Sequence, residues 1–241
     1  MRWPVSCRRQ EPSFEALVDM STLHNKLQAS PLLARVLPFV VFLVLTSAQG
    51  SFGPDSQFWV YLLKTLVGVW MIWTIWPLVG EMRWALSIEA VGGGLLVFLL
   101  WIGLDFPYPK LLEPDDSWDS QKHFGEDLMM FWLFAGTRIV GSTLVVPLLE
   151  EVFYRSFLYR YILSPNWLFT PHGLFDIRPF LGTSLIFGLA HQHWLAGILC
   201  GMIYQGVVLR TNRLGDAITA HAITNLLLGL WVVTQKQWHF W

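Results

Sequence analysis

Residues 128–163 read LMMFWLFAGTRIVGSTLVVPLLEEVFYRSFLYRYIL. It is mostly apolar and much longer than the about 20 residues that a helix needs to cross a bilayer. Arg138 and the charged cluster within Glu150–Arg155 interrupt it. Pro147 either kinks one helix or separates two, because proline removes a backbone donor from a helix interior. Both alternatives stay open at the level of sequence.

The composition of the whole chain indicates a membrane protein. Its 241 residues are 54% hydrophobic and only 14% charged, whereas soluble domains carry about 25% charged residues. Fourteen Trp and seventeen Phe fit an abundance of aromatic side chains at membrane interfaces. A net charge of −1 gives no sign of nucleic-acid binding. The two cysteines, Cys7 and Cys200, indicate neither a disulfide framework nor a thiolate metal site.

Six further apolar runs accompany the stretch at 128–163. We expect an all-α, polytopic transmembrane helical bundle with seven membrane spans, or eight if Pro147 separates two helices. The expected spans are Leu32–Ala48, Phe58–Val79, Trp84–Leu104, Leu128–Leu163, Phe180–His193, Trp194–Leu209 and Asp216–Thr234. The triplet Gly92-Gly93-Gly94 and the GxxxG pattern from Gly197 to Gly201 predict close approach between helices.

Charges between the spans predict the orientation of the chain, since cytoplasmic loops carry an excess of Lys and Arg. We interpret residues 1–30 as a cytoplasmic tail, because the first apolar run lies too far along the chain for a cleavable signal peptide. Residues 31–241 then form one integral-membrane domain, with its core in 128–234. The acidic loop Asp105–Asp127 is expected outside. The basic side chains expected inside are Arg83, Arg155, Arg160, Arg178, Arg210 and Arg213.

The segment Glu150-Glu151-Val-Phe-Tyr-Arg155 places two carboxylates and a guanidinium in apolar surroundings. At about 100° per residue, Arg155 lies about 40° around the helix from Glu151 and about 140° from Glu150. We therefore predict an ion pair between Glu151 and Arg155, which leaves Glu150 to face a cavity as a general base. The alternative is that all three side chains end a helix at the membrane interface.

Two further polar patterns follow, Phe187-Gly-Leu-Ala-His191 and His221-Ala-Ile-Thr-Asn225. His221 and Asn225 share a helix face and can both donate hydrogen bonds to an oxyanion; alternatively they join helices through polar contacts. His193 is expected to point away from His191, toward the membrane interface. Asp216 precedes the last pattern and is expected to cap its helix.

The depth of these side chains in the membrane is unresolved by sequence. With seven spans, Glu150 and His221 lie nearer the inner side, whereas His191 falls late in its span. An early start of that span, a re-entrant path or an eighth span would bring them level. Arg210 and Arg213 place the start of the His221 helix inside, so we expect substrate to arrive from the membrane or its cytoplasmic face.

The ordered set EExxxR, FxxxH and HxxxN resembles the type II CAAX prenyl endopeptidases and the related bacteriocin-processing and bacteriocin-immunity membrane proteins. The resemblance covers roughly Leu128 to Thr234, and every motif position is filled. It implies a helical, glutamic-type intramembrane protease of a bacterial cytoplasmic membrane. By this resemblance, Glu150 and His191 activate water and His221 and Asn225 stabilise the oxyanion. It leaves open the substrate, including whether that substrate is prenylated.

The sequence also allows three other functions. Glu150, His191 and His221 are possible zinc ligands, but no HExxH motif fixes a pair of ligands on one helix turn, so we expect no metal and no cofactor. Ser184 as a rhomboid-like nucleophile is a weaker alternative. A non-catalytic binding or immunity protein on the same scaffold, or a transporter, is the third. Expected partners are membrane lipid and a peptide or protein substrate, with no nucleic acid.

Overall fold

The computed structural model describes residues 20–53, 55–105, 108–109 and 118–241, and all regular structure in these ranges is helical. The predicted all-α class is therefore confirmed. The α-helices are α1 (Met20–Ala29), α2 (Pro31–Ser47), α3 (Ser56–Ile75), α4 (Ile88–Gly103), α5 (Ser120–Phe124), α6 (Leu128–Val140), α7 (Val146–Glu151), α8 (Tyr159–Leu163), α9 (Ile177–Leu189), α10 (Trp194–Thr211) and α11 (Leu214–Gln235). Two π-helical segments, η3 (Gly141–Val145) and η4 (Val152–Leu158), lie within 128–163, and η5 (Trp167–Phe169) and η6 (Trp238–Phe240) are short 3-10 turns.

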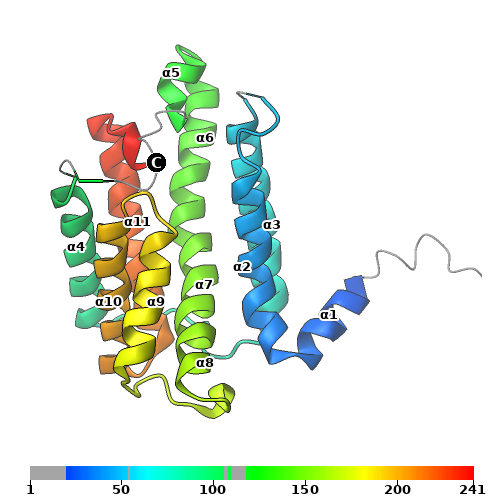
Figure 1. Cartoon of the computed structure of the whole chain (residues 1–241). Coiled ribbons are helices and arrows are strands. Elements are labelled where there is room, and N and C mark those ends of the chain that lie inside the picture. Colours follow the sequence, from blue (N-terminus) through cyan, green and yellow to red (C-terminus); the bar gives the residue numbers. More distant parts are fainter. Residues whose placement is uncertain (1–19, 54, 106–107, 110–117) are drawn as a thin grey trace, which may run out of the picture.

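The helices form a bundle around the long rod made by α6, α7 and α8 (Figure 1). Helices α2 and α3 lie together on one side of this rod, and α4, α9, α10 and α11 gather on the other. Successive long helices run in opposite directions, so the ends of the bundle differ in content. One end holds α5 and the turn between α2 and α3, and the other holds α1, α8 and the start of α11 (Figure 1).

Pro147 does not separate two helices. Helical structure runs without a break from Leu128 to Leu163, through the π-helical turn η3 directly before the proline. A proline lacks the donor for the carbonyl four residues earlier and its ring crowds that carbonyl, which here belongs to Thr143 inside η3. The wider π turn accommodates both effects. The eight-span alternative that rested on a break at Pro147 therefore loses its basis.

Within the residues that the structure describes, four helical stretches are long and apolar enough to cross a membrane, namely α3, the rod at Leu128–Leu163, α10 and α11. Three shorter apolar helices, α2, α4 and α9, stand among them. Large apolar side chains face outward on several helices, such as Val44, Trp73 and Leu99, which are 62%, 73% and 59% exposed. An apolar exterior of this kind fits contact with lipid. A count of seven spans remains a prediction.

Several helices begin or end at other residues than the predicted spans. Helix α3 ends at Ile75 and α4 begins only at Ile88, because residues 76–87 turn across the end of the bundle instead of extending the spans. Helix α9 has only 13 residues, from Ile177 to Leu189. Helix α1 lies within the segment 1–30 that was interpreted as a tail. Residues 1–19 lie outside the described ranges, as do 106–107 and 110–117 of the acidic loop.

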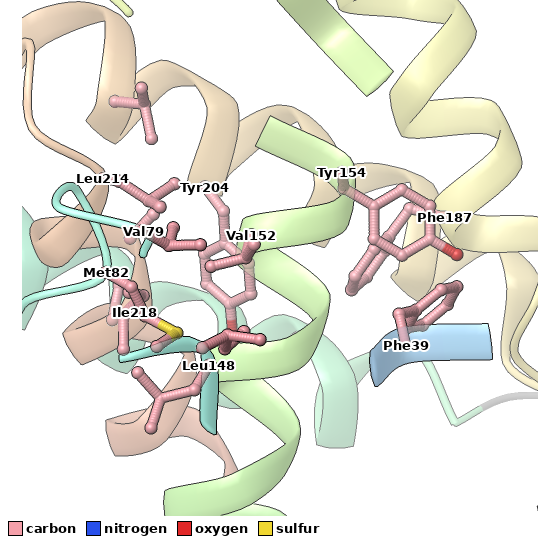
Figure 2. Packing of buried hydrophobic residues seen from close by; sticks show 14 of the residues in the cluster. Phe39, Val79, Met82, Leu148, Val152, Tyr154, Phe187, Tyr204, Leu214 and Ile218 are labelled. Atoms are coloured by element: carbon pink, nitrogen blue, oxygen red, sulfur yellow. The ribbon is translucent and has the colours of Figure 1, made fainter. Parts of the chain in front are cut away.

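The main core packs the rod against α10, α11 and the segment 76–87 (Figure 2). Val79 and Met82 of that segment are fully buried, close to Leu214 and Ile218 of α11 (Figure 2). Close helix approach relies on glycines, as predicted. A Cβ added at Gly94 would lie 2.6 Å from the carbonyl oxygen of Ala220.

Candidate functional site

Glu151 is the centre of a buried polar cluster. Its side chain is 0% exposed and forms an ion pair with Arg155, with 3.2 Å between Nε and Oε2. Arg155 also donates to the carbonyl oxygen of Gly201 at 3.3 Å and lies over the Phe187 ring, 4.5 Å from its centre. The predicted pairing of Glu151 with Arg155, four residues apart on one helix, is thus confirmed.

The second partner of Glu151 comes from α11. His221 Nδ1 lies 2.9 Å from Glu151 Oε1. Because an ionised carboxylate only accepts hydrogen bonds, Nδ1 carries the hydrogen and Nε2 is left for other contacts. The His221 ring stacks on Tyr204 with 5.0 Å between centres. Sequence alone did not predict this contact, which joins residues 70 positions apart.

His191 lies just beyond the end of α9, where the chain turns toward α10. Its Nδ1 is 2.7 Å from the carbonyl oxygen of Phe187. A carbonyl accepts, so Nδ1 must donate, and in the neutral ring Nε2 holds the free lone pair. That is the form of histidine that serves as a general base.

Glu150 and Asn225 complete the set. Glu150 is half-buried, and within the described part of the chain its Oε2 has no hydrogen-bond partner. Asn225 donates from Nδ2 to the carbonyl oxygen of Ser142 at 2.8 Å. One hydrogen of that amide remains for a ligand, since the group carries two.

All four side chains line one cavity of about 310 Å³, together with Tyr154, Phe187, Tyr204 and Thr224. Glu151 and Arg155 do not line it; Glu151 contacts His221 from behind the lining, and Arg155 pairs with Glu151. The structure therefore brings all six predicted site residues together. Lys64 and Arg138 also line the cavity; the only sequence signal for them was a charge inside an apolar span.

The position of the turn after α9 explains how His191 reaches the same depth in the bundle as Glu150 and His221. Helix α9 ends early, and its turn into α10 lies well short of the end of the bundle where α6 begins (Figure 1). His191 therefore reaches the cavity from a recessed turn. From there the cavity extends past Arg138 of α6, Thr46 of α2 and Leu228 of α11, away from Arg210 and Arg213. Entry of substrate from the membrane or its cytoplasmic face stays a prediction.

Two smaller expectations were wrong. Asp216 does not cap α11, because the helix begins at Leu214 after Arg213; it is a buried first-turn residue whose Oδ2 accepts from Arg213 Nε at 2.8 Å. His193 is not interfacial but 5% exposed, stacked on Phe240 and 3.4 Å from Asp105. The helix angle used to place it fails because the chain is turning there.

Ser184 and a metal centre are the two rival sites. Ser184 is buried at the contact between α9 and α10 and donates to the carbonyl oxygen of Phe180 at 2.7 Å, which fits a helix-contact role. Among the described residues, no group of three or more His, Cys, Asp or Glu side chains is arranged to hold a metal ion. Metal independence itself stays a prediction.

Comparison with known proteins gives one match. Residues 130–227 match the family model for type II CAAX prenyl endopeptidase Rce1-like proteins. The matched segment runs from α6 into α11 and includes all six predicted site residues. No curated protein and no solved structure matches the chain. The resemblance drawn from the three motifs is confirmed: this segment is similar to the Rce1-like domains, whose family is one of membrane proteases.

Proposed function

We propose that this chain is a glutamic-type intramembrane endopeptidase that hydrolyses peptide bonds of membrane-associated substrates. The observation that carries the proposal is the meeting of Glu150, His191, His221 and Asn225 on one cavity. These residues come from α7, the α9–α10 turn and α11, so only the folded bundle assembles them. The types are those that peptide hydrolysis needs, a base, imidazoles and an amide donor.

The reaction begins with water between Glu150 and His191. Glu150, ionised, accepts one proton while the water oxygen bonds to the scissile carbonyl carbon, and His191 Nε2 accepts a hydrogen bond from the same water. The carbonyl oxygen becomes an oxyanion. The proton on Glu150 then passes to the leaving nitrogen as the carbon–nitrogen bond breaks, and the acid and amine products separate.

Oxyanion stabilisation falls to Asn225 and His221. The free amide hydrogen of Asn225 is one donor. His221 can be the other only as an imidazolium, because its Nδ1 hydrogen is directed to Glu151 and neutral Nε2 would be an acceptor. A developing negative charge between two fixed donors in a partly dry cavity is strongly stabilised.

The substrate class extends to prenylated CAAX-type peptides. Phe39, Phe42 and Leu43 of α2 line the same cavity, and Val44 of that helix faces outward. This apolar wall suits a lipid chain or an apolar peptide segment.

The test is a protease assay on the purified protein with a panel of prenylated and plain membrane peptides, with and without a strong chelator. Glu150→Gln should abolish turnover, because it keeps the shape of the side chain and removes the base, and its unfolding temperature should stay near that of the wild type. Glu89→Gln is the matched control, since Glu89 pairs with Arg210 at the surface. Near wild-type turnover by Glu150→Gln sinks the mechanism, and loss of activity on chelation with rescue by Zn²⁺ replaces it with a metalloprotease.

A further inference from the structure

The backbone carbonyl of Ser142 holds the side chain of Asn225 and belongs to the π turn η3. Within this turn, the N–H of Val146 donates to the carbonyl oxygen of Gly141, five residues earlier. In an α-helix the same N–H would donate to the carbonyl oxygen of Ser142, four residues earlier. The π turn therefore takes away the donor that an ordinary helix would supply to Ser142.

Pro147 removes the next backbone donor that would serve this carbonyl. At the five-residue spacing of the π turn, the partner of Ser142 would be an N–H at position 147, and a proline has none. Asn225 supplies a donor instead, with 2.8 Å between its Nδ2 and the Ser142 carbonyl oxygen. Because a carbonyl inside a bundle is costly without a donor, the π turn and the proline together create a place that the Asn225 amide fills.

Close packing brings α11 within reach of this carbonyl. Gly229 lies four residues after Asn225 and therefore on the same face of α11. A Cβ added at Gly229 would lie 3.0 Å from Ile139 Cγ1 of α6, so the rod and α11 meet closely one turn beyond Asn225. A Cβ added at Gly141 would lie 2.7 Å from Thr65 Oγ1 of α3. The π turn is thus packed between α3 on one side of the rod and α11 on the other (Figure 1).

The contact also determines which way the Asn225 amide faces. An amide side chain has an oxygen that accepts hydrogen bonds and a nitrogen that donates two. If Oδ1 took the place of Nδ2, it would face the Ser142 carbonyl oxygen with no hydrogen between the two acceptors. The carbonyl therefore keeps Nδ2 toward the rod, and the second hydrogen of this nitrogen stays available for the oxyanion.

We propose that Pro147 is a positioning residue for the oxyanion site, which it serves through the Ser142 carbonyl and the Asn225 amide. This inference rests on the proposed protease function, which gives Asn225 its role. A residue other than proline at position 147 would return an N–H to the helix and offer the Ser142 carbonyl a backbone donor. Asn225 would then compete for that oxygen, and its amide would be free to turn Oδ1 toward the cavity, where it repels an oxyanion.

The experiment is a double-mutant cycle of wild type, Pro147→Ala, Asn225→Ala and the double variant on a cleaved peptide. Pro147→Ala should lower kcat by about tenfold to a hundredfold, which is part of the about 10²–10³-fold that a whole oxyanion donor contributes, and should change KM little. The two effects should not multiply, so the double variant should be as slow as Asn225→Ala alone. Pro147→Ala should also unfold at or above the temperature of wild type, because alanine favours a helix interior, whereas loss of a merely structural residue would lower both stability and kcat.

Pro38→Ala is the matched control, because Pro38 is also a buried proline inside a helix but belongs to α2. Whatever factor this change applies to kcat, the factor should be the same with and without Asn225→Ala, since the two sites share no partner. If Pro147→Ala likewise lowers kcat by one factor in both backgrounds, leaves kcat unchanged or acts on KM alone, the positioning role is overturned and the protease function stands.

Thermal unfolding tests the same coupling if the wild type cleaves no peptide, an outcome that counts against the proposed function alone. Asn225→Ala removes the side-chain donor of the Ser142 carbonyl, and the loss matters less where position 147 carries an N–H. Asn225→Ala should therefore lower the unfolding temperature less in the Pro147→Ala background than in the wild type. An equal lowering in both backgrounds overturns the link between Pro147 and Asn225.

Discussion

Glu151 shows how one buried carboxylate can organise a site that it does not line. It accepts from Arg155 on its own helix and from His221 on α11, and it is 0% exposed. Each partner would otherwise be a buried donor, and a buried charge is tolerated only when paired. The residue therefore fixes the position of His221 and directs its Nδ1 hydrogen from behind the cavity wall.

Replacing Arg155 should test this support directly. Arg155→Met keeps much of the side-chain volume but leaves Glu151 with an unbalanced charge, which costs about 3–5 kcal/mol for a buried pair. We expect a clear drop in the unfolding temperature measured in detergent, along with lost activity. Arg210→Met is the control, because Arg210 is 76% exposed. An Arg155→Met protein as stable as the wild type would count against the pair.

Asn225 should affect chemistry more than binding. Removing one oxyanion donor typically lowers turnover by about 10²–10³-fold. Asn225→Ala should therefore reduce kcat by about that factor and change KM little, because the interaction grows only in the transition state. Steady-state kinetics on a cleaved peptide would measure both. A raised KM at unchanged kcat would instead mean that Asn225 holds the ground-state substrate.

The contact between α9 and α10 depends on glycines, which have no side chain. A Cβ at Gly201 would lie 2.8 Å from Ser184 Cα, and one at Gly197 would lie 2.8 Å from Gly188 Cα. Both obstacles are backbone atoms, so the helices would have to separate. The same contact carries Arg155, which donates to the Gly201 carbonyl oxygen.

Gly201→Ala should consequently destabilise the protein by about 1–3 kcal/mol, the usual penalty for overpacking, and should lower activity by displacing Arg155. Gly206→Ala on the same helix is the matched control, since nothing lies within 4 Å of its added Cβ. Alanine favours helix there by about 0.5–1 kcal/mol. Thermal unfolding should be measured for both variants. If Gly201→Ala is as stable as Gly206→Ala, the close contact at Gly201 does not limit the stability of the protein.

Glu81 joins three parts of the chain at one end of the bundle. Its Oε1 accepts from Arg35 of α2 at 2.6 Å and from Arg160 of α8 at 3.2 Å, and Ser156 donates to it as well. Glu81 itself belongs to the segment between α3 and α4. Burial alone would raise its pKa, but the charge of Arg35 and hydrogen bonds from Ser156 and Arg35 lower the pKa of Glu81 to about 2.

This shift predicts how stability depends on pH. A carboxylate with a lowered folded-state pKa stabilises the fold above its unfolded value of 4.5, and that contribution disappears as pH falls from 4.5 toward 2. At neutral pH, Glu81→Gln should lower stability by up to about 3 kcal/mol, and the gap from wild type should close as pH drops below 4.5. Burial also lowers the pKa of His172 to about 4, and the charge of Glu81 opposes that lowering, so the two proteins are compared above pH 4, where the His172 ring is neutral in both folded states. A gap that stays constant with pH would contradict the role of Glu81.

The sequence predicted contacts within a single helix, but it did not predict contacts that join several helices. The pairing of Glu151 with Arg155 follows from helical periodicity, and the apolar runs predicted the class of fold. The contact of His221 with Glu151 joins distant segments, so no local pattern carries it. The short α9 that sets the depth of His191 depends on a turn packed among other helices. Lys64 and Arg138 were visible as charges, but the Tyr61 ring that both contact is a product of tertiary packing.

The π turns at Gly141–Val145 and Val152–Leu158 also affect the direction in which later side chains of the rod point. In an α-helix each added or removed residue turns everything beyond it by about 100°, so the number of residues between Arg138 and Glu150 fixes whether both point at one cavity. A π turn holds one residue more than an α turn, so a one-residue deletion in the first π turn would be absorbed there: the turn would relax to an ordinary α-helix and Glu150 would keep its direction. The same deletion elsewhere between Arg138 and Glu150 would turn Glu150 away from His191 by about 100°. An alignment or transplant of this rod must therefore place any one-residue gap within a π turn.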